Sequence, residues 1–253
     1  MLGVGNEMKV KSAIAVLFCF SVFVSSAREW VFTDGHVIEA EYRKILFDDV
    51  VLELADGEEL KVPLDQLSEF DRNHVQLLNP PTLDIELARK SRQRSFPPTY
   101  GGGAPPESTY CTFFAKIKQV SSRQMLYDHP LTLEFFALGE EIGADKRVLL
   151  DRKVKTFTLS EENNYRFICN GREVQMLDYN INAQRRGTRY GGYLVVIRDV
   201  RGEIIAHKGT SKSLYQNLSN LSKIKAGWYF DDECNRCLPT PPQPWPYLVR
   251  QGL

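Results

Sequence analysis

The chain has little of what short enzyme signatures are built from. Its 253 residues contain four histidines, His36, His74, His129 and His207, and their spacing matches no common metal site. No Gly-x-Ser-x-Gly elbow, His-Glu-x-x-His zinc motif or dinucleotide-binding glycine fingerprint is present. These absences argue against catalysis, so we expect a protein that is not an enzyme, with no cofactor and no metal site.

Long apolar runs are also scarce, and the most prominent one is short. Ala13–Val24 follows Lys9 and Lys11 and precedes the small residues Ser25-Ser26-Ala27, which is the pattern of a secretory signal with its cleavage site. As a helix these residues span about 18 Å, less than the hydrocarbon core of about 30 Å. We therefore predict a signal peptide over residues 1–27, export to the periplasm or the extracellular space, and no stable membrane span after cleavage.

Cysteine is rare, and one of the five cysteines lies in the predicted leader. Cys111, Cys169, Cys234 and Cys237 remain, and an even number in an exported chain suggests disulfides, with three possible connectivities. Cys234 and Cys237 form a single CxxC, which could also be a redox or metal pair, although it offers only two zinc ligands. We expect structural disulfides or unreactive thiols, with Cys111 and Cys169 facing a core.

The chain has no net charge, yet its two halves differ. Residues 28–79 contain 5 basic and 13 acidic residues, whereas residues 108–253 contain 21 and 15. Such asymmetry is typical either of halves that dock or attract charged partners, or simply of solvated surfaces that keep a protein soluble.

Apolar and polar residues alternate in the part of the chain that follows the predicted leader. Three runs between residues 29 and 64 have period two, and Asp34-Gly35 and Asp56-Gly57 are typical hairpin turns. Short, sequentially paired strands in so few residues predict a small curled barrel. Ser68, with Asp71 three residues later, predicts a capped helix of about ten residues that ends at Pro80-Pro81.

The segments "REWVFTDGHVIEAEY" and "VVLELADGEELKVPLDQLSEFDR" resemble the first homology domain of the SLA-type endocytic adaptors over residues 28–78. The resemblance implies an SH3-like barrel. In fungal adaptors this module recognises Asn-Pro-Phe-x-Asp peptides, and similar modules occur near the signal peptide of bacterial envelope proteins. Because residues 28–79 are acidic here, a basic peptide or the basic second domain is the more plausible ligand. The candidate peptide-binding residues are Trp30, Tyr42, Lys44 and Lys61, although Trp30 also suits a core position.

Proline and glycine then mark a boundary. Residues 80–108 combine basic residues with "FPPTYGGGAPPES" and predict a flexible linker. Residues 109–232 carry seven or eight strand-like runs and one amphipathic pattern over 212–224, which predict an antiparallel β-sandwich covered by a single helix. Residues 233–253 are a proline-rich tail. The predicted fold class is therefore mainly β, a small SH3-like barrel followed by a β-sandwich-like domain.

These features favour an exported, non-enzymatic interaction protein that binds a peptide or protein partner in the cell envelope. We expect no nucleic-acid ligand, and the sequence leaves the oligomeric state open. The alternative is a secreted enzyme or carbohydrate-binding protein whose site lies in residues 109–232, near Tyr190, Tyr193 and Trp228.

Overall fold

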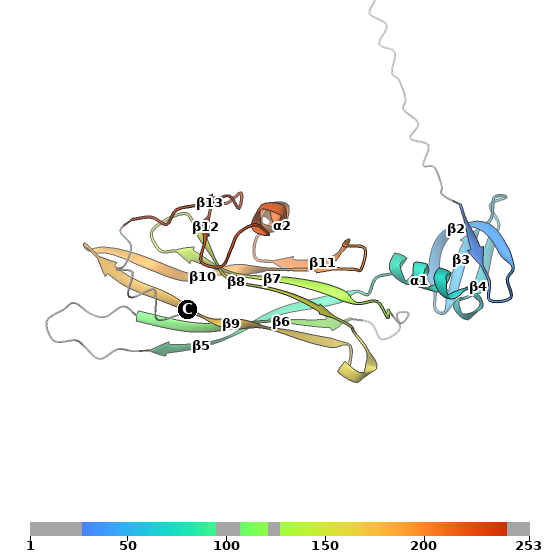
Figure 1. The fold of residues 1–253 in the computed structure, drawn as a ribbon, viewed down its shortest axis with the longest axis horizontal. Coiled ribbons are helices and arrows are strands. Elements are labelled where there is room, and N and C mark those ends of the chain that lie inside the picture. The colour runs from blue at the N-terminus through green and yellow to red at the C-terminus, as the bar shows by residue number, and fades with distance from the viewer. Residues whose placement is uncertain (1–26, 95–106, 121–126, 242–253) are drawn as a thin grey trace, which may run out of the picture.

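The computed structural model describes residues 27–94, 107–120 and 127–241 (Figure 1). The predicted leader up to residue 26 and the tail from residue 242 lie outside these ranges. The described chain is mainly β, with one small and one large antiparallel sheet, so the predicted fold class is confirmed at this level. The helices within the described ranges are too short or too polar to span a bilayer.

The small sheet belongs to the first domain, residues 28–79. Its strands follow the chain order β1 (Arg28–Val31), β2 (Val37–Leu46), β3 (Asp49–Glu53) and β4 (Glu59–Pro63). After β4 the 3-10 helix η1 (Leu64–Gln66) brings the chain back to β1. Phe32 forms a bridge with Leu67, and the Ser68 amide donates to the Val31 carbonyl at 2.8 Å. The segment that follows β4, one edge strand of the sheet, thereby pairs with the end of β1, the other edge strand.

Helix α1 (Glu69–Leu78) begins where the sequence predicts it. The Ser68 hydroxyl accepts from the Asp71 amide at 3.2 Å, and the Asp71 carboxylate accepts from the Ser68 hydroxyl at 2.8 Å. That carboxylate is fully buried; it also accepts from the Val31 amide at 2.8 Å and pairs with Arg28. Ser68 thus caps the helix, and Asp71 ties its first turn to β1, because the buried charge of the aspartate needs these donors.

The second domain is a two-layered sandwich (Figure 1). One layer contains β5 (Leu83–Arg94), β6 (Glu107–Gln119) and β9 (Arg166–Ile181). The 3-10 helix η2 (Glu161–Asn163) precedes β9. The other layer contains β7 (Leu131–Glu141), β8 (Arg147–Phe157), β10 (Gln184–Arg198), β11 (Ile204–Gly209), β12 (Tyr229–Phe230) and β13 (Arg236–Cys237).

Strand β10 joins the two layers. Its first residues, Gln184–Gly187, pair with β9, whereas Thr188–Arg198 pair with β7. Gly187 has φ 131°, and a Cβ there would lie 1.9 Å from the Leu177 carbonyl oxygen. Glycine is required at this crossing because no side chain fits between the two strands.

Apolar side chains fill both faces of the second layer. Phe135 and Val195 belong to the cluster between the layers, whereas Phe136 and Val196 point to the opposite face, as the two-residue period of a strand requires. That opposite face is covered by helices α2 (Lys212–Gln216) and α3 (Leu218–Leu221).

Several boundaries differ from the sequence predictions. Leu83–Arg94, expected in the linker, form β5, which pairs with β6 in continuous register from Leu83 opposite Gln119 to Arg94 opposite Ser108. Residues 95–106 lie outside the described ranges. The predicted single helix is interrupted at Asn217, whose side-chain amide donates to the Ser213 carbonyl at 3.0 Å and ends α2. The expected tail contributes β13, so the sandwich extends past residue 232.

The two domains touch at the C-terminal end of α1. The Arg201 guanidinium donates to the Leu77 carbonyl at 2.9 Å and pairs with Asp199 at 2.7 Å. The Asp128 amide also donates to the Gln76 side chain at 3.4 Å. A cation from the sandwich therefore satisfies a helix-end carbonyl, which has no partner within the helix itself.

Candidate functional site

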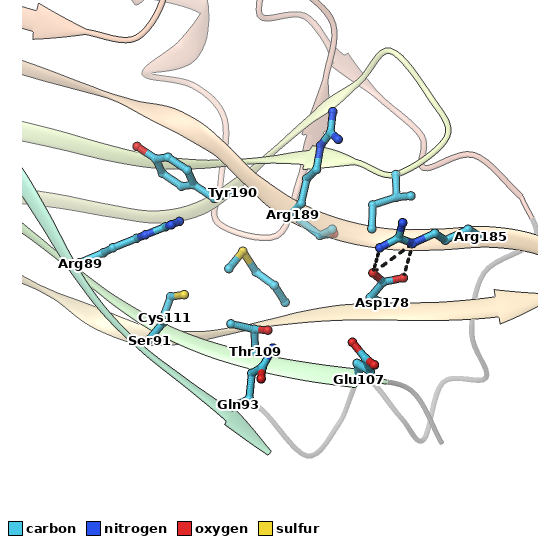
Figure 2. A pocket seen from close by; sticks show the side chains of 13 residues that line it. Arg89, Ser91, Gln93, Glu107, Thr109, Cys111, Asp178, Arg185, Arg189 and Tyr190 are labelled. Atoms are coloured by element: carbon cyan, nitrogen blue, oxygen red, sulfur yellow. Dashed lines mark hydrogen bonds and ion pairs between the residues drawn. The ribbon is translucent and has the colours of Figure 1, made fainter. Parts of the chain in front are cut away.

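The inward faces of the first sandwich layer change from apolar to polar along each strand. On β5, Leu83, Ile85 and Leu87 pack against the core, whereas Arg89 and Ser91 continue the same alternation. Strands β6 and β9 repeat the change toward the same end of the sandwich. Inward polar groups need water or ligand around them. The structure provides this space as a cavity of about 320 Å³, which we name the sandwich pocket (Figure 2).

Three arginines line the sandwich pocket, and they differ in their partners. Arg185 Nε donates to the Asp178 carboxylate at 3.0 Å, and Arg189 Nε donates to Glu140 at 3.0 Å. Arg89 instead lies over the Tyr190 ring, 4.9 Å from its centroid. Within the part of the chain that the structure describes, Arg89 forms no ion pair. It is therefore the cation of this pocket that a ligand can use.

The other end of the sandwich pocket is acidic. Glu107 on β6 lies directly opposite Asp178 on β9, and like charges in such cross-strand positions destabilise a sheet. Figure 2 shows these two carboxylates and Arg185 at one end of the pocket, and Arg89 with Tyr190 at the other.

A buried thiol lies among the residues that line the sandwich pocket. Cys111 is 1% exposed, and burial raises the pKa of its thiol despite the nearby Arg89. A thiol that stays protonated is a poor nucleophile. The described histidines lie elsewhere; His207, for example, stacks on Tyr215 with 3.7 Å between the ring centroids. The described ranges also bring no three metal-ligating side chains together.

The four predicted peptide-binding residues divide between core and surface. Trp30 is 0% exposed, and its indole donates to the Ala40 carbonyl at 3.0 Å, so of the two positions considered for it, core and ligand platform, it occupies the core position. Tyr42 is half-buried, and its hydroxyl donates to the Asn79 side chain at 2.8 Å. Lys44 and Lys61 are exposed, and both lie opposite Val51 in register. The structure brings the two lysines to one side of the sheet.

The same outer side of the first domain carries a row of glutamates. We name it the acidic face; it consists of Glu29, Glu39, Glu41, Glu53 and Glu59. Glu29 lies opposite Glu39, and Glu53 lies between Glu41 and Glu59. Arg43, the extra residue of a bulge in β2, pairs with Glu53 at 2.7 Å and holds the pKa of that carboxyl below its ordinary value. The period-two alternation in the sequence places these glutamates on one face of their strands, but only the strand register reveals which carboxylates are neighbours.

The four cysteines in the described ranges are free thiols in this structure, which is one of the two alternatives that the sequence left open. Cys111 and Cys169 do face the core between the layers, but they lie opposite Val174 and Ala115, four positions apart on β6. Burial raises the pKa of Cys234 to about 11 and also raises that of Cys237. This direction is opposite to the depressed pKa that thiol–disulfide exchange requires.

The aromatic residues of the carbohydrate hypothesis do not form a common surface. Tyr190 lines the sandwich pocket, where it is stacked on Phe113 with 5.6 Å between the centroids. Tyr193 packs against the core between the layers, whereas Trp228 lies on the helix-covered side with Arg236 over its ring. Tyr190 and Tyr193 therefore lie on the same side of the second layer, and Trp228 lies on the other side.

Comparison with known proteins gives no family. The chain matches no family model and no curated protein. A solved structure from Akkermansia muciniphila is similar at 15% identity and a TM-score of 0.22, over 53% of this chain and 73% of that one. Its description names no activity, and a similarity at this level carries no argument about function.

Proposed function

We propose that the chain is an exported, non-enzymatic interaction protein whose first domain binds a basic segment of a protein partner in the cell envelope. The leader-like sequence at residues 1–27 supports export. The glutamates of the acidic face support a partner segment that is basic. The resemblance to the adaptor module supports a peptide-binding role for the same domain.

The observation that carries this proposal is the like-charge pairing on the acidic face. Glu29 opposite Glu39, and Glu53 between Glu41 and Glu59, give three cross-strand glutamate pairs in one small sheet. Each such pair costs stability. Arg43 offsets this cost at Glu53 and Glu41, whereas Glu29 and Glu39 form no ion pair within the described ranges. A cationic partner would offset the remaining repulsion.

The acidic face also has room for a partner. The hydrogen bonds that join the two domains within the described ranges come from Gln76 and Leu77 of α1, not from the outer side of the sheet. This supports a partner other than the basic second domain as the ligand of the acidic face. Lys44 and Lys61 lie next to the acidic face on the same side, where they would position an acidic group of the partner and set its direction.

The test is peptide binding to the mature full chain, measured by fluorescence anisotropy with labelled lysine-rich, neutral and glutamate-rich nonapeptides. We expect the lysine-rich peptide to bind most tightly, with an affinity that decreases as salt increases. The double variant Glu29→Gln/Glu39→Gln should weaken this binding at least about fivefold.

The matched control removes two glutamate charges from the sandwich instead of from the first domain. Glu161 and Glu162 are exposed in η2, so Glu161→Gln/Glu162→Gln should leave binding of the lysine-rich peptide unchanged. Equal binding of all three peptides, or an equal loss in the control variant, would contradict the proposal.

A further inference from the structure

We infer that the sandwich pocket is a second binding site, for a short zwitterionic peptide, with the ligand carboxylate at Arg89 and its ammonium group at Glu107. This site goes beyond the proposed function, because it lies in the other domain and takes a small ligand rather than a protein segment.

The contacts of Arg89 orient its guanidinium and leave it free to bind a carboxylate. Its guanidinium is 4.9 Å from the centroid of Tyr190, and Tyr190 is in turn stacked on Phe113 of the opposite layer. Stacking holds the plane of a guanidinium while its N–H groups stay free to bind an anion with two parallel hydrogen bonds. Because Arg89 has no ion pair within the described ranges, a ligand carboxylate would replace no protein partner.

Neutral hydrogen-bonding groups lie along the pocket between its charged ends. Ser91 lies opposite Cys111 and Gln93 lies opposite Thr109, all among the residues that line the cavity. Hydroxyl and amide side chains both donate and accept. They therefore match the N–H and C=O of a peptide group better than they match an apolar or a purely anionic ligand.

The acidic end of the pocket favours a cation. Glu107 and Asp178 lie opposite each other in register, and Arg185 forms its salt bridge with Asp178. Arg185 also interacts electrostatically with Glu107, but one guanidinium cannot neutralise two carboxylates, so one negative charge remains in excess at this end. An ammonium group there would relieve the repulsion between them.

The size of the cavity limits the ligand. A volume of about 320 Å³ is near the lower end of known small-molecule sites, which suits a ligand of about two residues. A ligand of this size with opposite charges at its ends matches the opposite charges at the two ends of the cavity, as seen in Figure 2.

The test is calorimetric titration of the full chain with alanyl-alanine, N-acetyl-alanyl-alanine and alanyl-alanine amide. The first probe carries both charges, the second lacks the ammonium group, and the third lacks the carboxylate. We expect alanyl-alanine to bind most tightly. Arg89→Met should weaken it about 10- to 100-fold, the range for losing charge-assisted hydrogen bonds, and should leave the amide unaffected. Glu107→Gln should weaken alanyl-alanine but not its acetylated form.

The matched control is Arg92→Met. Arg92 lies on the same strand but pairs with Glu173 at 2.8 Å and lies over Tyr110, and it is not among the residues that line the cavity. This variant should bind alanyl-alanine as the unaltered chain does, and hydrogen exchange of the strand amides should confirm that both variants are folded. Three outcomes would overturn the inference: equal affinity for the three probes, undiminished binding in folded Arg89→Met, or no binding of alanyl-alanine at millimolar concentration.

Discussion

Removing charge from the acidic face should stabilise the first domain, and the size of the effect follows from the register. Glu29 and Glu39 lie directly opposite each other, so their carboxylates are about 6 Å apart if extended alike. Coulomb's law gives a repulsion of about 0.7 kcal/mol at that distance in water. At an ionic strength of about 0.01 M the Debye length is about 30 Å, and most of this repulsion remains. We expect Glu29→Gln and Glu39→Gln each to stabilise the domain by about 0.6 kcal/mol.

The assay is a double-mutant cycle followed by hydrogen exchange of the β1 and β2 amides in the full chain. A stabilisation of about 0.6 kcal/mol slows exchange through opening of the domain about threefold. The double variant should gain less than the sum of the two single variants, because either substitution already removes the pairwise repulsion. At about 0.15 M salt the coupling should fall to roughly half.

The control uses the same substitution where the opposite residue is a cation. Glu86 on β5 lies opposite Lys116 and pairs with it at 3.3 Å, so Glu86→Gln should make exchange in β5 and β6 slightly faster rather than slower. A Glu29–Glu39 coupling that is zero within error at low salt, or that does not change with salt, would refute the electrostatic explanation.

Three further predictions concern other parts of the chain. Trp30→Ala should destabilise the first domain by about 3–5 kcal/mol, so that hydrogen exchange shows β1–β4 open while the sandwich stays protected. Arg201→Met should cost about 1–3 kcal/mol and speed exchange in the last turn of α1, since Asp199 loses its counter-charge and Leu77 its donor; Arg198→Met, which alters only a bond to Gly202 at 2.9 Å, should not. Cys234, with its pKa raised from 9.0 to about 11, should react slowly with iodoacetamide near about pH 8 in the folded chain. Unfolding then releases a proton between these two values, so stability should decrease as pH rises through that window; rapid labelling by mass spectrometry would contradict this.

Local patterns predict the first domain well because each element there has its own signal. Ser68 and Asp71 place the start of α1 correctly, and the alternating runs place β2, β3 and β4. Such signals depend only on residues close together along the chain, so they can be recognised from the sequence without the structure. Whether Lys44 and Lys61 both lie opposite Val51 depends on register, which the local pattern does not determine.

The missed strand β5 shows the opposite case. Leu83, Ile85 and Leu87 do alternate with polar residues, but Arg89 and Ser91 occupy the inward positions that follow. The hydrophobic period therefore ends in the middle of the strand, and the proline and glycine beyond it suggest a linker. The polar inward residues that hide the strand are the same ones that form the sandwich pocket, so the site was missed together with the element that carries it.

The strand that joins the two layers has a consequence for how the sandwich unfolds. Because β10 pairs with β9 at one end and with β7 along the rest, one ladder of hydrogen bonds runs through both sheets. Separating either sheet from the other would require breaking hydrogen bonds of β10, which belongs to both. The sandwich should therefore melt in a single cooperative transition, without a stable half-formed intermediate that exposes bare sheet edges to aggregation.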